Sequence, residues 1–484
     1  MKMEEKKNLQ DGATKHTAVL DKEYKSNFEN KDLEGKLDEI SELLLNREFG
    51  KIRELLTSME PVDIGLLLGE APEKDLPILF RILPKEIAAE TFVEMDSDEQ
   101  ELLIDAFSDR ELKDVLDELF IDDTVDIIEE MPANVVKRIL RHTDPVTRKD
   151  INQILQYPKD SAGSIMTTEY VSLKKGMTVA QAFDRIRRTG VDKETIYTCY
   201  VTDYNRHLIG LVSVRELLLS EYNAVINDIM ETNIISVQTH EDREAVAIKF
   251  DKYDFISLPV VDTENRLVGI VTFDDAIDVL QEEYTEDIQK MSAVQPIEEP
   301  YLKTSVLKHA KNRILWLLFL MLASTITGTI ITNYENAFVD VPILVAFIPL
   351  LMGTGGNAGS QSSTMIIRGL AMNELQPKDI LKILFKEFRI GIIVGIVLAV
   401  VNTVKIFIMY PNENCVYLSI VTGISLVTTT ILAKLLGCSL PILAKKLKLD
   451  PALMAAPLIS TILDTCSVTI FFNVAMWFMN MPFN

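Results

Sequence analysis

Five long apolar segments constrain the fold of this chain more than any other feature. They cover about residues 314–332, 339–371, 388–410, 416–440 and 452–479. Each is close to or above the roughly 20 residues that an α-helix needs to cross the hydrocarbon core of a bilayer. We therefore expect residues 301–484 to form a transmembrane domain with five helical spans.

The basic residues between these segments predict the orientation of the chain in the membrane. Lys and Arg precede the first span and separate the second from the third and the fourth from the fifth, whereas the other two connections have none. Loops rich in Lys and Arg stay in the cytoplasm. The pattern predicts a multi-pass protein of the cell membrane with a cytoplasmic N-terminus and an extracytoplasmic C-terminus.

Charge is divided unevenly between the two parts of the chain. Residues 301–484 contain 14 Lys and Arg against 8 Asp and Glu, whereas the first 300 residues contain 35 against 64. An acidic soluble part argues against nucleic acid as a partner, because phosphate binding requires basic patches. It is compatible with cation binding. The four cysteines and five histidines have no metal-ligand spacing, which argues against a zinc site and a disulfide framework.

The first 160 residues are expected to form a tail and a helical domain. Residues 1–34 are charged and poor in apolar side chains, a composition typical of disorder. Residues 35–160 contain turn signals about every 12 residues, near Pro61, Pro72, Pro84, Asp96, Ser108, Asp122, Pro132 and Asp144. Because Pro, Ser and Asp favour the starts of helices, this spacing predicts a small all-α solenoid of short helices.

Residues 161–275 contain an internal repeat. IMTTEYVSL at residues 165–173 corresponds to IMETNIISV at 229–237, and LIGLVSVREL at 208–217 corresponds to LVGIVTFDDA at 267–276. Each half is expected to have an extended start, a helix, two strands and a closing helix. The repeat resembles a tandem CBS pair, an α/β module that commonly senses small ligands and regulates a neighbouring domain.

Residues 276–300 are expected to form an acidic helix that leads to the membrane part. Asp275, Asp278, Glu282 and Glu286 recur at a spacing that places them on one helix face. Like charges one turn apart destabilise a helix by about 0.2–0.5 kcal/mol per pair. Hard divalent cations would neutralise these carboxylates, although a solvated acidic face is an alternative interpretation.

The second apolar segment contains a polar and glycine-rich run, PLLMGTGGNAGSQSS, at residues 349–363. Its glycines, including Gly353 and Gly359, favour breaking or loosening a helix. Irregular backbone at membrane depth is tolerated only where it packs on protein or lines a water-filled path, and its exposed carbonyls would be cation ligands. The run therefore predicts an ion path. A close-packed glycine cluster between helices is the alternative.

Asp464 lies about a dozen residues into the last span. An ionised carboxylate at this depth costs at least about 2.5–3.5 kcal/mol and usually marks an ion or proton path. Lys405 and Lys434 are near span ends, where lysines can extend to the interface, so Asp464 has no obvious partner. With the glycine-rich run it would form an oxygen-only site. Such a site suits Mg²⁺ or Ca²⁺, and a single carboxylate favours Mg²⁺, which keeps most of its water.

The whole arrangement resembles the MgtE family of magnesium channels. That family has a helical domain, a CBS pair, a connecting "plug" helix and five spans in this order. GTGGNAGSQS, DVLQEEYTEDIQKMSAV (278–294) and DPALMAAPLISTILD (450–464) match its signatures. The resemblance implies a homodimer in membrane lipid with its pore between the two copies. Asp464 would be the pore carboxylate that holds hydrated Mg²⁺, with Gly356 and Asn357 nearby.

The resemblance also implies that cytosolic Mg²⁺ gates the pore. The carboxylates that correspond to sensing positions are Glu90, Asp122, Asp126, Asp242, Glu244, Asp254, Asp275, Asp278, Glu283, Glu286, Asp287 and Asp450. Bound Mg²⁺ would screen their repulsion and allow the soluble part to compact and the plug to close, whereas low Mg²⁺ would let them separate. For ATP in the CBS pair, Arg215 and Phe255 are retained, but Thr198 stands where ATP-binding relatives can present a stacking aromatic.

Three other functions remain as alternatives. A cation-coupled Mg²⁺ exchanger could use Asp464, but would need a second site for the coupling ion. A non-conducting membrane sensor of the CBS type would leave the glycine-rich run and Asp464 unexplained. We do not expect an enzyme, because the sequence has no nucleophile–base constellation, phosphate loop or catalytic metal cluster.

Overall fold

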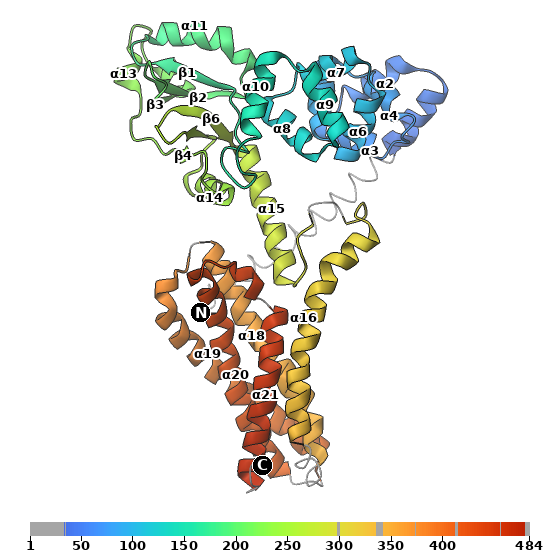
Figure 1. Cartoon of the computed structure of the whole chain (residues 1–484), viewed down its shortest axis with the longest axis vertical. Helices are drawn as coiled ribbons and strands as arrows, with labels where there is room; N and C mark the ends of the chain where they lie inside the picture. Colours follow the sequence, from blue (N-terminus) through green and yellow to red (C-terminus); the bar gives the residue numbers. More distant parts are fainter. Residues whose placement is uncertain are drawn as a thin grey trace, which may run out of the picture. The chain divides into compact units, whose positions relative to one another are not determined.

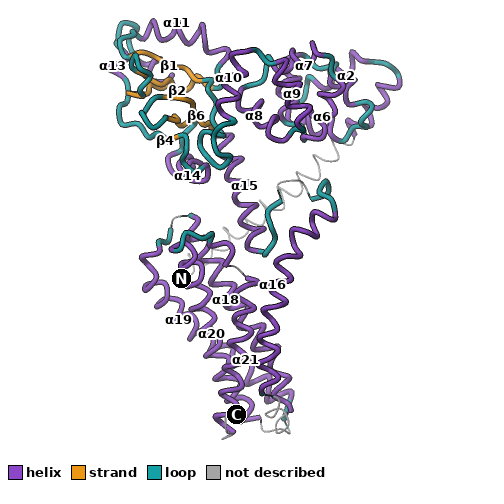
Figure 2. The backbone as a smooth tube through the Cα atoms, viewed as in Figure 1, coloured by secondary structure: helices purple, strands orange, loops and turns teal. Residues whose placement is uncertain are grey.

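The computed structural model describes residues 33, 35–297, 301–334, 342–372, 374–411, 415–454 and 456–479. The expected disordered tail, residues 1–34, lies outside the described residues apart from residue 33. The chain forms two compact units, Met1–Leu280 and Gln281–Asn484. All the described strands lie in the first unit, and the second is helical (Figure 2).

The first unit begins with a solenoid of short helices, as the spacing of turn signals predicts. These are α2 (Phe49–Leu56), α3 (Pro61–Gly69), α4 (Leu76–Phe80), α5 (Lys85–Val93), α6 (Ser97–Ala106), α7 (Asp109–Leu116), α8 (Ile121–Glu130), α9 (Ala133–His142) and α10 (Pro145–Ile154). Asp96 and Ser108 form capping boxes, and Asp144 accepts hydrogen bonds from the first turn of α10. These side chains satisfy backbone N–H groups that would otherwise lack partners.

Helix α8 begins differently from the prediction. Asp122 is not its cap, because the helix starts at Ile121 and Asp122 lies buried in its first turn. The carboxylate of Glu169 accepts a hydrogen bond of 3.0 Å from the Ile121 N–H. A residue 48 positions later therefore caps α8, which a local turn signal cannot reveal.

The predicted CBS repeat folds into two three-stranded sheets. The first half contains β1 (Tyr170–Lys174), α11 (Val179–Thr189), β2 (Thr195–Thr202), β3 (Leu208–Ser213) and α12 (Val214–Leu219). The second contains α13 (Ile226–Ile229), β4 (Val237–Gln238), α14 (Arg243–Tyr253), β5 (Ser257–Val261), β6 (Leu267–Thr272) and α15 (Phe273–Met291). In each half the first strand runs parallel to the second and the second antiparallel to the third. The two sheets thus repeat one topology, as the sequence repeat predicts.

The second unit contains five helices that are long and apolar enough to cross a membrane, which confirms the predicted number of spans. They are α16 (Val306–Asn333), α18 (Ile348–Ala371), α19 (Ile380–Met409), α20 (Cys415–Lys446) and α21 (Ala456–Met479), with a short 3₁₀ turn, η4 (Pro451–Met454), before the last. Helix α18 packs against α20 and α21, and α19 runs along α20 (Figure 1). Helices α16, α19 and α20 are longer than the predicted apolar segments, because polar residues continue them beyond the apolar core, whereas α18 and α21 begin later than predicted.

The glycine-rich run does not break its helix, so that part of the prediction is wrong. Helix α18 continues through every glycine of the run from Ile348 to Ala371. A Cβ on Gly359 would lie 2.8 Å or less from Ile459 and Leu463, and one on Gly437 of α20 would lie 2.3 Å from the Gly359 carbonyl oxygen. The glycines therefore allow close packing with α20 and α21, as in the alternative interpretation. In hydrocarbon the backbone must satisfy its own hydrogen bonds, which favours the unbroken helix.

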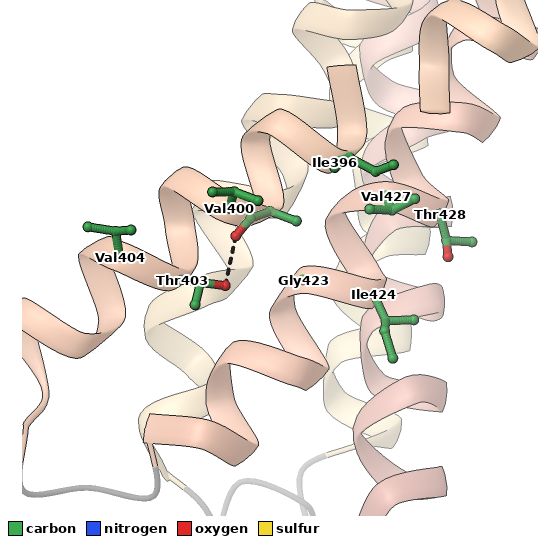
Figure 3. A pocket seen from close by; sticks show the side chains of 9 residues that line it. Ile396, Val400, Thr403, Val404, Gly423, Ile424, Val427 and Thr428 are labelled. Carbon is green, nitrogen blue, oxygen red and sulfur yellow. Dashed lines mark hydrogen bonds between the residues drawn. The ribbon is translucent and has the colours of Figure 1, made fainter. Parts of the chain in front are cut away.

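An apolar groove lies on the surface between α19 and α20 (Figure 3). Its volume is about 430 Å³, and Val400, Val404, Ile424 and Val427 are among its lining residues. The Thr403 hydroxyl donates a 2.8 Å hydrogen bond to the backbone of its own helix, so it offers little to an ion. The groove has the chemistry of a lipid-facing surface.

Candidate ion path and acidic clusters

Helix α18 has an exposed polar face within a membrane-spanning segment. Its exposed residues include Gly353, Asn357, Gln361, Thr364 and Arg368, a spacing that forms one stripe along a helix. The predicted site residues Gly356 and Gly359 lie on the opposite, buried face with Ser362 and Ser363. Polar side chains are costly in hydrocarbon and normally face protein or a water-filled cavity. The stripe therefore requires water or another protein surface beside it.

Asp464 lies beside the seam between α18 and α21. It is half-buried, and Ser460, one turn earlier on α21, is the side chain nearest to Gly356. A Cβ on Gly356 would lie 3.1 Å from the Ser460 hydroxyl oxygen. The structure thus brings Asp464 to the same helix pair as Asn357, which follows Gly356. Because α18 is unbroken, its carbonyl oxygens are bonded within the helix, and side chains rather than backbone supply the oxygen ligands along its described length.

Two charged residues behind α18 were not assigned from the sequence. Lys434 on α20 is only 5% exposed, and its Nζ donates a 3.2 Å hydrogen bond to Oε1 of Gln361. The hydroxyl of Ser362 donates a 2.6 Å hydrogen bond to Glu387 on α19. The expectation that Lys434 extends to the interface is wrong, because α20 continues about three more turns to Lys446.

The first unit contains a buried acidic cluster formed by α8, the start of α15 and Glu194. Burial and the nearby carboxylate of Asp275 raise the pKa of Asp123 and that of Asp126 to about 7. Burial and the neighbouring carboxylates also raise the pKa of Glu194 to about 8. The pKa of Asp275 rises to about 6, chiefly through burial, and the same cause raises the pKa of Asp122 well above its usual value.

The carboxylates of this acidic cluster do not have all their hydrogen bonds. One carboxylate oxygen of Asp122 and one of Glu194 are buried without a hydrogen-bond partner. Protonation or a nearby cation would relieve the repulsion. Within the described residues, no three His, Cys, Asp or Glu side chains converge closely enough to hold a metal ion directly. The cluster therefore suits a hydrated cation, or direct ligation after local rearrangement.

The other predicted sensing residues of the first unit lie apart from this cluster. Asp242 caps the N-terminus of α14, and Asp254 ends the same helix with a left-handed backbone. Glu244 lies in the first turn of α14, and Glu90 is exposed on α5. The carboxylate affected by the charge of Asp278 is that of Glu94, the residue directly after α5, whose pKa is raised by burial and by Asp278. Sequence reasoning missed Glu94, which lies one turn after Glu90.

In the second unit, the end of α15 meets the loop before α21. The Nζ of Lys290 lies 2.7 Å from Oε1 of Glu286 and 2.8 Å from Oδ2 of Asp450. Burial and the Asp450 carboxylate raise the pKa of Asp287, and Glu283 is half-buried one turn earlier. Acidic residues of α15 therefore lie together with Asp450, and the cation between them is the ammonium group of Lys290.

The residues considered for a nucleotide occupy ordinary structural positions. The Ser213 hydroxyl caps α12, and the Asp275 carboxylate accepts a hydrogen bond from the Thr272 N–H. Arg215 is exposed, and the ring of Phe255 lies 5.5 Å from that of Tyr253. Ser213 and Asp275 thus serve as capping residues at the starts of α12 and α15.

A tandem CBS module, a helical solenoid and five helices that are long and apolar enough to cross a membrane define a multi-pass membrane protein that carries a CBS pair. Family models match at residues 59–160 (MgtE intracellular N domain), at 162–221 and 226–282 (CBS domain) and at 348–474 (MgtE, divalent cation transporter). Magnesium transporter MgtE of Thermus thermophilus is 36% identical over 90% of this chain and 97% of its own. The protein of that name from Bacillus subtilis is 32% identical over 89% and 95%. The chain belongs to the MgtE family.

Among solved structures, the chain is similar to the cytosolic domain of the Mg²⁺ channel MgtE in complex with ATP. That domain is 36% identical, and the match covers 49% of this chain and 98% of the domain with a TM-score of 0.47.

Proposed function

We propose that this chain is a Mg²⁺-selective channel that mediates magnesium uptake. The single observation that carries the proposal is the exposed polar stripe of α18, which lies within a membrane-spanning helix that packs against α21, the helix of Asp464. Relatives named as magnesium transporters support the choice of ion, because they match along nine tenths of the chain.

The proposed pore lies between two copies of the chain. In a homodimer, the two α18 stripes would face each other on opposite sides of a water-filled path. Their polar groups would then contact water instead of lipid. The side-chain oxygens available along the stripe of α18 are those of the Asn357 amide and the Thr364 hydroxyl. One carboxylate per copy suits an ion that keeps most of its water, and Mg²⁺ dehydrates reluctantly. The basic loops favour a cytoplasmic N-terminus and an extracytoplasmic C-terminus.

We further propose that cytosolic Mg²⁺ closes the channel. The supporting observation in the first unit is the buried set of carboxylates around Asp122 and Asp275, whose repulsion a divalent cation would relieve. In the second unit, Asp287 and Asp450 provide a second pair of like charges. Mg²⁺ must bind the closed arrangement more tightly than the open one for this to work. Because Thr198 occupies the stacking position in the CBS pair, we propose Mg²⁺ rather than ATP as the main regulator.

Mg²⁺ flux into proteoliposomes tests the function. Asp464→Ala should abolish uptake while the protein still inserts and stays monodisperse, because no other carboxylate has been assigned to the path. Asp379→Asn is a matched control that removes a half-buried carboxylate from the same unit, where it pairs with Lys382 at 3.1 Å. That control should transport at the wild-type rate.

The same preparation separates a channel from an exchanger. A channel carries Mg²⁺ current without a gradient of any second ion, whereas a coupled exchanger requires one. Wild-type flux from the Asp464→Ala variant, or flux that depends on an imposed Na⁺ or proton gradient, would contradict the proposal.

A further inference from the structure

Helices α18, α19 and α20 meet at two charged residues, Glu387 and Lys434, which lie behind the exposed face of α18. Glu387 of α19 accepts a hydrogen bond from Ser362, and Lys434 of α20 donates one to Gln361. The two contacted residues are neighbours on α18. Glu387 and Lys434 carry opposite charges, and their hydrogen bonds hold α18 at two successive positions.

This charged pair lies within an otherwise apolar environment. On one side, Ile366, Ile383 and Cys438 belong to a buried cluster, and each lies one turn from a member of the polar group. On the other side, Ala433 packs in a cluster with Ile459 and Leu463, next to Asp464. Buried charges in a membrane helix are expensive and usually functional. Apolar residues of similar volume would stabilise such a site equally well or better, so stability alone does not account for the pair.

The pair controls the orientation of one side chain of the stripe. Gln361 lies on the exposed face of α18, one turn after Asn357. An ammonium group has donors only, so Lys434 must hold the amide oxygen of Gln361 rather than its nitrogen. The oxygen is thereby directed toward Lys434 and is not free to ligate an ion.

We propose that Glu387 and Lys434 are positioning residues for ion permeation. They hold α18 from behind, and so fix the rotation of its polar face and the orientation of the Gln361 amide. This inference rests on the proposed function, because the orientation of that face matters to transport only if ions pass along it.

The test measures Mg²⁺ flux per correctly folded molecule in proteoliposomes, as both maximal flux and the Mg²⁺ concentration at half-maximal flux. The variants are Glu387→Gln, Lys434→Met and the charge-swapped double variant Glu387→Lys/Lys434→Glu. Lys405→Met is the matched control, since Lys405 is an exposed lysine of α19.

Each single variant should lower the maximal flux per molecule by about tenfold or more, because small misplacements of positioned groups cost up to about a hundredfold. The charge swap should recover most of this loss, since the Ser362 hydroxyl and the Gln361 amide can each either donate or accept. The control should behave as wild type. A purely structural role would reduce the yield of folded protein but would leave the flux per molecule and the half-maximal concentration unchanged.

Normal flux per molecule in both single variants would overturn the inference. So would a folded charge-swapped variant that transports no better than they do. If the single variants fail to fold, Gln361→Ala decides the question, because it keeps both charges. A folded Gln361→Ala with altered half-maximal concentration supports the inference, and one with wild-type kinetics overturns it. Failure of the proposed function is distinct, because the wild type would then carry no Mg²⁺ or Asp464→Ala would carry it normally.

Discussion

Lys290 supplies a positive charge where carboxylates of α15 meet Asp450. Its side chain is 22% exposed and that of Asp450 is 30% exposed, so solvent screens the ion pair only in part. The sequence places Glu286, Asp287 and Asp450 among sensing residues that would need an external cation. The structure shows that the chain itself provides one, which can share the site with Mg²⁺ or compete with it.

Lys290→Met should therefore make this contact dependent on Mg²⁺. Charge-assisted hydrogen bonds contribute about 1.5–3 kcal/mol, and partial exposure reduces that value, so we expect about tenfold faster amide exchange at residues 286–291 without Mg²⁺. Millimolar Mg²⁺ should restore protection. Hydrogen exchange of the full chain measures this, with Lys378→Met as the control. Exchange in Lys290→Met equal to wild type without Mg²⁺ would show that the ion pair contributes nothing.

Sequence reasoning selects a single residue most readily where its type is unusual for its surroundings, such as a carboxylate in an apolar span. Asp464 is conspicuous because an apolar span surrounds it. Glu387 and Lys434 were missed because each looks like a residue at a span end, and their partners Ser362 and Gln361 are 25 and 73 positions away. Glu194 was missed for the same reason, since only the fold brings it to α8.

At the scale of elements, the packing of α18 on α20 depends on backbone contact. A Cβ on Gly437 would collide with the backbone of Gly359 rather than with a flexible side chain. Overpacking of this kind costs about 1–3 kcal/mol or more.

Gly437→Ala should accordingly lower the thermal unfolding midpoint of the detergent-solubilised protein by several degrees. Gly328→Ala is the control, because a Cβ on that glycine of α16 meets nothing within 4 Å. The control should match or exceed wild-type stability, since Ala is the better helix former. An unchanged midpoint in Gly437→Ala would mean that α18 and α20 can move apart at little cost in the free energy of unfolding.

The elements themselves followed from the sequence to a large extent. Caps such as Ser108 and Asp144 marked helix starts, the internal repeat gave the two sheets, and length with hydropathy gave the spans. The prediction that the glycine-rich run breaks its helix was wrong because the helix propensity of glycine is measured in water. In hydrocarbon the hydrogen bonds of the helix and its close packing outweigh a cost of about 1 kcal/mol per glycine.

At the scale of the whole molecule, the acidic soluble part makes stability depend on pH. The pKa values of Asp275, Asp123 and Glu194 are about 6, 7 and 8 in the folded state, whereas free carboxyl groups titrate near 4. The folded state therefore holds these protons more strongly than the unfolded state does. Their stabilising contribution is complete below about pH 4 and is lost as the pH rises through 6 to 8.

We expect amide exchange in α8 to accelerate between pH 5.5 and 8 in EDTA, after correction for the intrinsic effect of pH. Millimolar Mg²⁺ at pH 8 should slow it again, because the deprotonated cluster attracts a divalent cation. Asp123→Asn/Asp126→Asn should flatten both responses. Asp98→Asn/Asp105→Asn, which removes two exposed carboxylates from α6, should not. Protection of α8 that is independent of pH and of Mg²⁺ would contradict a sensing role for the cluster.

The contact between Gly359 and Gly437 also limits how the membrane unit can move. Where two backbones touch, no intervening side chain can change its rotamer to let one helix slide past the other, and close-packed contacts of this kind switch between discrete arrangements rather than deform. Helices α18 and α20 should therefore travel together as a rigid pair, and α19, which runs along α20, should follow. Helix α21 meets the glycines of α18 through side chains, which can change rotamer. A gate that widens the proposed path would therefore act by displacing α21, and Asp464 with it, relative to Asn357.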